Sequence, residues 1–199
     1  MSEIFKIITD DLGTTKITPE VGTYELVPDN HPALREVMPE FKFDGTFDAN
    51  EIASKLVETA KKHNGIGLSA NQCGVFERVF VIGTEHFQIG CINPKVIAKS
   101  EEVSKDNEGC LSFPALYVKV ERPNWCDVEF YDETGTFKQI RMEGLTARCF
   151  LHELDHLNGI KFTDHAGPVA LKLAQERQRK MIKQMQRISK NAKKLEKTK

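Results

Sequence analysis

The sequence predicts an α+β fold in which antiparallel strands surround a central helix and an amphipathic helix follows at the C-terminus. Several short segments in the middle of the chain alternate apolar and polar residues, the period of two that is typical of half-buried strands. Short connections separate some of them, which favours antiparallel pairing because parallel strands need long crossovers. Amphipathic segments with a helical period precede and follow the strands. We therefore expect one domain over residues 1–165 and a helical tail over residues 166–199.

The composition is that of an ordinary globular protein. The 199 residues are 40% hydrophobic and 29% charged, which excludes disordered and fibrous classes. No run approaches the length of a membrane span, and the first residues lack the layout of a secretory signal or transit peptide, so a cytoplasmic protein is expected. The odd number of scattered cysteines favours free thiols over a disulfide framework. These are Cys73, Cys91, Cys110, Cys126 and Cys149.

The first half of the chain begins with turn-rich sequence. Residues 1–46 are expected to form loops with one short helix or strand. A helix is predicted over residues 49–63, because Asp48 suits an N-cap and Glu51 lies at the capping-box position. Its end is predicted at a run of basic residues, with Gly65 as the C-cap glycine.

Strands and one more helix fill the second half. Strands are predicted over residues 78–83, 91–98, 117–120, 127–131 and 137–141, with a hairpin turn at 132–135. The stretch that starts at residue 104 is polar and is predicted to be loop until Glu108. A helix is predicted over 145–157, ended by Gly159. Its buried face is expected to consist of Leu145, Cys149, Leu154 and Leu157.

The helix at 145–157 contains the pattern H-E-x-x-H. His152 and His156 are four residues apart, so both imidazoles project from one face of the helix and can bind the same divalent metal ion. Glu153 lies beside them, where it could transfer protons. The central helix is therefore expected to be a metal-binding helix, although the same letters could also belong to a plain amphipathic core helix.

A catalytic metal site needs a third protein ligand, and the sequence offers three routes to one. The extended motif with a third histidine is excluded, because Phe162 occupies that position. Glu176 follows on a later helix, but it lies among basic residues that favour ordinary surface pairing. Cys110 follows a glycine at a predicted strand boundary, although a single cysteine is more often a small buried apolar residue.

Three segments in this order resemble the motifs of the peptide deformylase family. The family motifs G-x-G-L-A-A-x-Q, E-G-C-L-S and Q-H-E-x-D-H-L-x-G correspond to residues 65–72, 108–112 and 151–159, and the resemblance covers about residues 25–164. By position, the resemblance implies that Cys110, His152 and His156 bind one divalent ion per chain, Fe²⁺ or a substitute such as Zn²⁺. It also implies that Glu153 is the general acid and base.

The resemblance assigns the remaining site residues as well. The Gln72 amide and the backbone N–H of Leu111 would bind the developing oxyanion. Gly65, Ile66 and Gly67 would pair with the backbone of an N-formylmethionyl peptide, which is capture along the edge of a strand. Read alone, this glycine-containing segment could equally be a helix-to-strand connection that needs unusual backbone angles.

The chain departs from the family pattern at three positions. Ser69 replaces the usual Ala, a small change that should be tolerated. Leu151 replaces the frequent Gln before the first histidine and removes a polar group that could orient the ligands. Tyr117 stands where many members have Arg, which affects side-chain preference near the site. Arg122 matches a family position, and Asp155 could pair with it to brace the helix.

The charge of the chain is strongly asymmetric. Residues 166–199 carry 11 Lys and Arg against 2 Asp and Glu, or +9, which leaves −10 for the rest. Ala174, Met181, Ile182, Met185 and Ile188 trace an apolar stripe through this basic tail. The stripe could pack on its own domain, or the tail could bind an anionic partner. The resemblance favours the ribosome as that partner.

The sequence therefore predicts a metal-dependent hydrolase that removes the N-formyl group from the initiator methionine of nascent proteins. The implied source is a bacterium, a bacterial virus or an organelle. A metallopeptidase or other amidase at the same site is the alternative within hydrolases, and a metal-containing RNA-binding protein with vestigial chemistry is the alternative from another class. Neither a membrane span nor DNA binding is expected.

Overall fold

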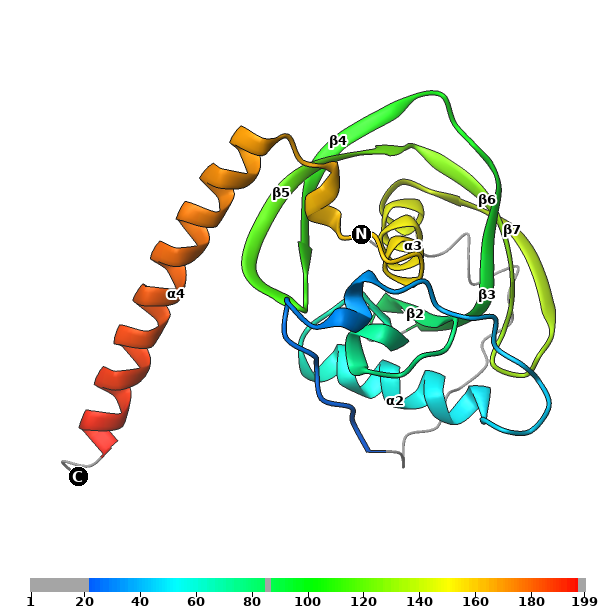
Figure 1. The fold of residues 1–199 in the computed structure, drawn as a ribbon, viewed down its shortest axis with the longest axis horizontal. Coiled ribbons are helices and arrows are strands. Elements are labelled where there is room, and N and C mark those ends of the chain that lie inside the picture. Colours follow the sequence, from blue (N-terminus) through cyan, green and yellow to red (C-terminus); the bar gives the residue numbers. More distant parts are fainter. Residues whose placement is uncertain (1–21, 85–86, 197–199) are drawn as a thin grey trace.

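The computed structural model describes residues 22–84 and 87–196 (Figure 1). It has the predicted α+β class, with two antiparallel sheets and three α-helices among the described residues. The expectation for residues 1–21 lies outside this part of the chain. Between residues 22 and 46 one short 3-10 helix forms, η1 (Pro32–Arg35), and the rest is irregular, as expected for that stretch.

The larger sheet has five antiparallel strands in the order β1, β2, β3, β6, β7. These are β1 (Gly67–Ser69), β2 (Val79–Thr84), β3 (Phe87–Lys99), β6 (Trp125–Tyr131) and β7 (Phe137–Glu143). The second sheet pairs β4 (Val103–Cys110) with β5 (Phe113–Pro123). The hairpin predicted between β6 and β7 is confirmed, since Gly135 in its turn has φ +80° and its N–H donates to the Asp132 carbonyl.

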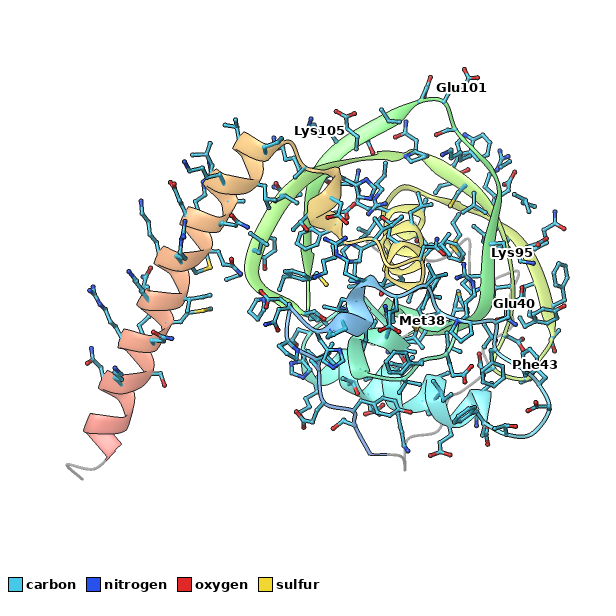
Figure 2. The ribbon with its side chains drawn as sticks, in the orientation of Figure 1. Met38, Glu40, Phe43, Lys95, Glu101 and Lys105 are labelled. Atoms are coloured by element: carbon cyan, nitrogen blue, oxygen red, sulfur yellow. The ribbon has the colours of Figure 1, made fainter. Side chains whose placement is uncertain are left out.

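Strand β4 corrects the prediction of a loop from residue 104 up to Glu108. Its side chains are almost all exposed, as Lys105 illustrates in Figure 2, and Glu108 is the buried exception. A strand with this exposure lacks the apolar alternation by which strands are recognised. Backbone pairing with β5 holds it, from Val103 opposite Pro123 to Gly109 opposite Tyr117.

Helix α2 (Ala49–Lys62) begins where the sequence predicts. The Asp48 side chain accepts from the N–H groups of Asn50 and Glu51 at 2.9 and 3.2 Å, as an N-cap does. The expected C-cap at Gly65 is wrong. Asn64 is the left-handed residue, at φ 55°, and the Gly65 N–H closes the helix by donating to the Ala60 carbonyl.

Helix α3 (Gly144–Leu157) lies in the middle of the fold, with strands of both sheets curving around it (Figure 1). Phe150 packs edge-on against Phe80 of β2 at 5.0 Å between ring centroids, in a cluster shared with β6 and β7. Leu157 is fully buried, but Leu145 is 38% exposed, so its predicted place in the core is wrong. It is on the first turn of the helix, where it lines a cleft instead.

Helix α4 (Pro168–Glu196) is anchored only at its start. Ala174 is buried and Leu171 packs against the cluster that contains Phe113 and Leu116, while the Gln178 side chain donates to the Pro114 carbonyl at 2.9 Å. Beyond this point the helix leaves the body (Figure 1), and nearly all of the side chains described there are exposed.

The apolar stripe of the tail therefore divides in two. Ala174 packs on the domain and Ile182 is half-buried, whereas Met181, Met185 and Ile188 are 44%, 58% and 61% exposed. Deleting the chain from about residue 170 onward would therefore also remove residues that pack on the domain. Such a deletion could not measure the role of the exposed tail by itself. No helix in the described part of the chain is long and apolar enough to cross a membrane.

Gly159 follows the end of α3, where the backbone is left-handed and there is no room for a Cβ atom. Its φ is +70°, and an added Cβ would lie 2.5 Å from the Arg35 carbonyl oxygen. We expect Gly159→Ala to lower the free energy of unfolding by more than the ~1–2 kcal/mol of the left-handed conformation, because rigid backbone must also move.

Gly135→Ala is the matched control. Gly135 has φ +80°, but the nearest atom to its added Cβ is a Phe43 side-chain carbon at 3.6 Å. Urea unfolding of both variants should show the larger loss for Gly159→Ala. Equal losses would mean that the contact with Arg35 does not constrain this turn.

Candidate metal and catalytic site

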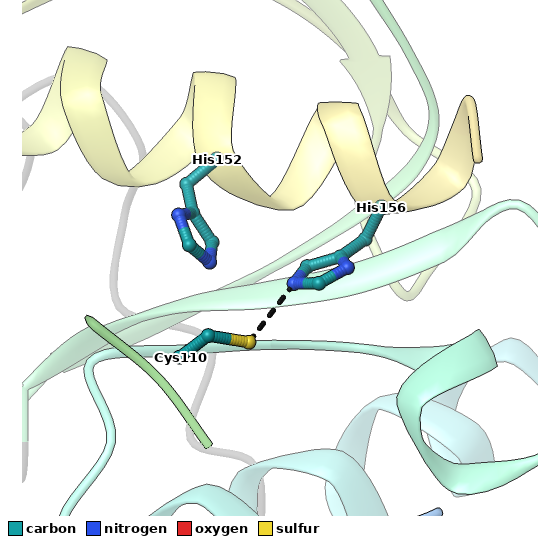
Figure 3. A group of neighbouring side chains, drawn as sticks. All are labelled: Cys110, His152 and His156. Carbon is teal, nitrogen blue, oxygen red and sulfur yellow. Dashed lines mark hydrogen bonds between the residues drawn. The ribbon is translucent and has the colours of Figure 1, made fainter. Parts of the chain in front are cut away.

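Cys110, His152 and His156 come together at the centre of the fold (Figure 3). Both histidines project from α3, and Cys110 is the last residue of β4. One donor atom from each lies within 4.8 Å of the others, and Cys110 Sγ is 3.2 Å from His156 Nε2. A strand and a helix that are far apart in sequence thus supply the donors.

These donors fit a divalent metal ion. His152 Nδ1 contacts Glu108 Oε2 at 2.9 Å, which leaves Nε2 free to bind a metal. Burial and the nearby His152 lower the pKa of His156 well below its usual value, so its imidazole is in the neutral form that metals require. Three protein donors leave a fourth position open, as in catalytic zinc sites, and thiolate and imidazole are donor types that suit both zinc and iron.

The surroundings of His152 favour positive charge at the site. Burial alone would lower the pKa of His152, but hydrogen bonds with Cys110 and Glu108 raise it to about 10. The three donors therefore surround a position where a cation is electrostatically favoured.

Glu108 is the residue that the sequence reasoning missed in this cluster. Arg122 binds both of its oxygens at 3.0 Å, and Arg148 binds Oε1 at 2.8 Å. Burial would raise the pKa of Glu108, but hydrogen bonds with His152 and Arg122 lower it to about 2. Arg122 also donates to Asp155 Oδ2 at 2.6 Å, the pairing that the sequence led us to expect.

Arg148 connects the two elements that carry Cys110 and the two histidines. From α3 it donates to Glu108 and Ser104 of β4 and to the Val120 carbonyl of β5, at 2.8 to 3.1 Å. It precedes His152 by one helical turn, so helical spacing could have indicated it. Leu151, in contrast, packs against the main core, and His152 is oriented by Glu108 instead.

Glu153 is buried beside the donors, with 4% of its surface exposed. Burial raises its pKa. An added Cβ on Gly67 would lie 2.5 Å from Glu153 Oε1, so the glycine lets strand β1 approach the carboxylate. The Ser69 hydroxyl donates to Glu153 Oε2 at 2.6 Å, a contact that the sequence did not indicate.

The Gln72 amide is fixed on both sides. Its Oε1 accepts the Ser69 N–H at 3.0 Å, and its Nε2 donates to Ser112 Oγ at 3.1 Å and Cys110 Sγ at 3.2 Å. Gly65 lies against Leu111, the residue after Cys110, because an added Cβ would be 2.7 Å from Leu111 Cδ1. The first and second family-like segments thus face each other.

A cleft of about 430 Å³ opens over these groups. Gly65, Ile66 and Gly67 line it, as do Gln72, Cys110, Leu111, His152 and Glu153. Half-exposed apolar side chains lie around it, namely Ile66, Tyr117 and Leu145. Glu176 is exposed on α4 and does not line the cleft, whereas Phe162 packs against the His152 ring at 5.7 Å.

We expect Arg148→Met to lower the free energy of unfolding by about 3 kcal/mol, because it leaves buried Glu108 and two carbonyl oxygens with fewer partners. Arg141→Met removes an exposed guanidinium that pairs with Asp127, and should change stability by less than about 1 kcal/mol. Urea unfolding compares the two. A loss for Arg148→Met no larger than for the control would contradict the bridging role.

Comparisons with known proteins agree on one family. The model of the polypeptide deformylase family matches residues 23–172. A peptide deformylase of Rhizobium meliloti is 42% identical over 147 residues, which cover 70% of this chain and 82% of that protein. A peptide deformylase from Synechococcus elongatus, solved in complex with actinonin, has a TM-score of 0.73 at 32% identity and covers 78% of this chain and 85% of that one.

A deformylase structure from Legionella pneumophila gives a similar result, with a TM-score of 0.74 at 30% identity over 83% of this chain and 98% of that one. The agreement of sequence, fold and family model extends over most of the domain that carries the cleft. The chain therefore belongs to the peptide deformylase family of enzymes.

Proposed function

We propose that this chain removes the N-formyl group from the initiator methionine of newly made proteins, in the cytoplasm, with one divalent metal ion per chain. The observation that carries the proposal is the convergence of Cys110, His152 and His156 within 4.8 Å, beside buried Glu153, in a protein of this family. Ferrous iron is the expected metal, with zinc or another divalent ion as a substitute.

Cys110, His152 and His156 would hold the ion. When bound, such an ion acts as a Lewis acid that polarises a carbonyl and lowers the pKa of water. Glu108 keeps the His152 ring in the orientation and tautomer that a metal ligand needs, since it accepts at Nδ1. Arg122 of β5 donates to Glu108, and Asp155 of α3 in turn accepts from Arg122.

Glu153 is the proposed general acid and base. It takes a proton from the attacking water and later delivers it to the departing amine. Burial raises its pKa toward the range in which a carboxyl group can do both near neutral pH.

Gln72 Nε2 and the Leu111 N–H are the proposed oxyanion donors. The Gln72 amide is held through its own oxygen, and its Nε2 lies beside the cleft, 3.2 Å from Cys110 Sγ. Fixed donors of this kind stabilise a developing negative charge without reorganisation, and losing one typically costs about 10²–10³ in rate.

The proposed peptide site is the segment Gly65, Ile66 and Gly67. Strand β1 is at the edge of the five-stranded sheet and pairs on one side with β2, so its other edge can accept an extended peptide. Gly65 lies against Leu111, and both line the cleft together with Cys110 and His152, which would place the formyl group near the proposed metal donors.

We expect Glu153→Ala to keep its metal and to lose formate release by about 10²-fold or more, because a proton-transfer group is removed but no donor atom is. Anaerobically purified protein should be given a formyl-Met-Ala-Ser peptide, with formate, internal cleavage and bound metal measured together. Turnover near the wild-type rate would contradict the assigned role. Internal cleavage without formate would indicate a peptidase.

We further propose that the exposed part of α4 binds the ribosome through its basic face. Changing Lys183, Arg187 and Lys190 to Gln should weaken co-sedimentation with ribosomes at low salt and reduce its salt dependence, while peptide turnover stays unchanged. The control makes the same changes at three exposed lysines of the body, Lys95, Lys99 and Lys105. Equal effects in the two variants would contradict a specific role for α4.

A further inference from the structure

Ser69 is the last residue of β1 and is fully buried. Its hydroxyl lies 2.6 Å from Glu153 Oε2 and 3.0 Å from the Glu153 carbonyl oxygen, and its N–H donates to Gln72 Oε1 at 3.0 Å. One residue therefore contacts both side chains that the proposed reaction uses for proton transfer and for oxyanion binding. Neither contact depends on a bound metal.

The hydroxyl contact is the one that constrains the Glu153 carboxylate. The distance of 2.6 Å is typical of a charge-assisted O–H···O⁻ hydrogen bond. Among residues 22–84 and 87–196, Ser69 is the only side chain that hydrogen-bonds to this carboxylate. The last torsion of a glutamate side chain is broad, so a carboxylate without such a contact can rotate over a wide range.

The two carboxylate oxygens are thus in different surroundings. Oε2 is bound by Ser69, and Oε1 lies next to Gly67, where an added Cβ would be only 2.5 Å away. Gly67 belongs to the segment that lines the cleft. Fixing Oε2 therefore leaves Oε1 toward the segment proposed to bind the peptide.

We propose that Ser69 is a positioning residue for the reaction: its hydroxyl holds Glu153 with one oxygen directed at the cleft. The inference rests on the proposed function, and it concerns the hydroxyl alone. Alanine at this position, the usual residue in the family motif that this segment resembles, would keep the N–H contact with Gln72 but could not contact the carboxylate. This chain thus has one constraint on its acid-base group that an alanine-containing site lacks.

The variant Ser69→Ala removes only the hydroxyl, and alanine is the usual residue at this position of the family motif. We expect kcat for formyl-Met-Ala-Ser to fall about tenfold, equivalent to about 1.4 kcal/mol, with KM within about twofold and bound metal unchanged. Ser54→Ala is the matched control, since Ser54 is a buried serine of α2 that does not line the cleft. It should leave kcat unchanged.

A second comparison separates an effect through the carboxylate from one through the backbone of α3. In a Glu153→Ala background, Ser69→Ala should cause no further loss of residual turnover, because the group that it positions is gone. The same tenfold loss in both backgrounds would overturn the proposal and place the effect in the Glu153 carbonyl contact.

Wild-type kcat in Ser69→Ala would also overturn the proposal while leaving the proposed function intact. Absence of formate release by the wild-type holoenzyme would overturn the proposed function, and this inference with it.

Discussion

The buried carboxylate of Glu108 determines how the parts of the site are held relative to one another. It is on β4, two residues before Cys110, and it binds Arg122 of β5 and both Arg148 and His152 of α3. An isolated buried charge is strongly unfavourable, whereas paired and hydrogen-bonded charges are tolerated. The cluster is therefore stable only when the small sheet and the helix are docked, and docking is what brings the cysteine to the two histidines.

Much of this site could be predicted because the relevant residues lie close together in sequence. The spacing of His152 and His156 gives a shared helical face whatever the rest of the fold does. The N-cap at Asp48 and the turn between β6 and β7 were also predicted correctly, since local side-chain and backbone geometry decides them. Cys110 was different. Its position relative to the histidines followed from the family resemblance, and no spacing rule would have supplied it.

What the sequence could not reveal depends on tertiary contacts. Strand β4 is held by pairing with β5 and buries only one side chain, so it has no hydrophobic pattern. Leu145 follows the helical period but is at the cleft, where an apolar residue contacts solvent or a ligand. The Ser69 hydroxyl looked like a neutral replacement for a methyl group, because its partner Glu153 is 84 residues away in the chain.

The anchoring of α4 has a geometric consequence. Its first turns are part of the folded body and the Gln178 side chain hydrogen-bonds to the Pro114 carbonyl, so the remaining 18 residues continue as one helix of about 27 Å. A flexible tether of the same charge would only raise the local concentration of the enzyme at an anionic surface. A continuous helix that is anchored at its start also sets a direction: whatever holds its tip influences which way the cleft faces, and at what distance.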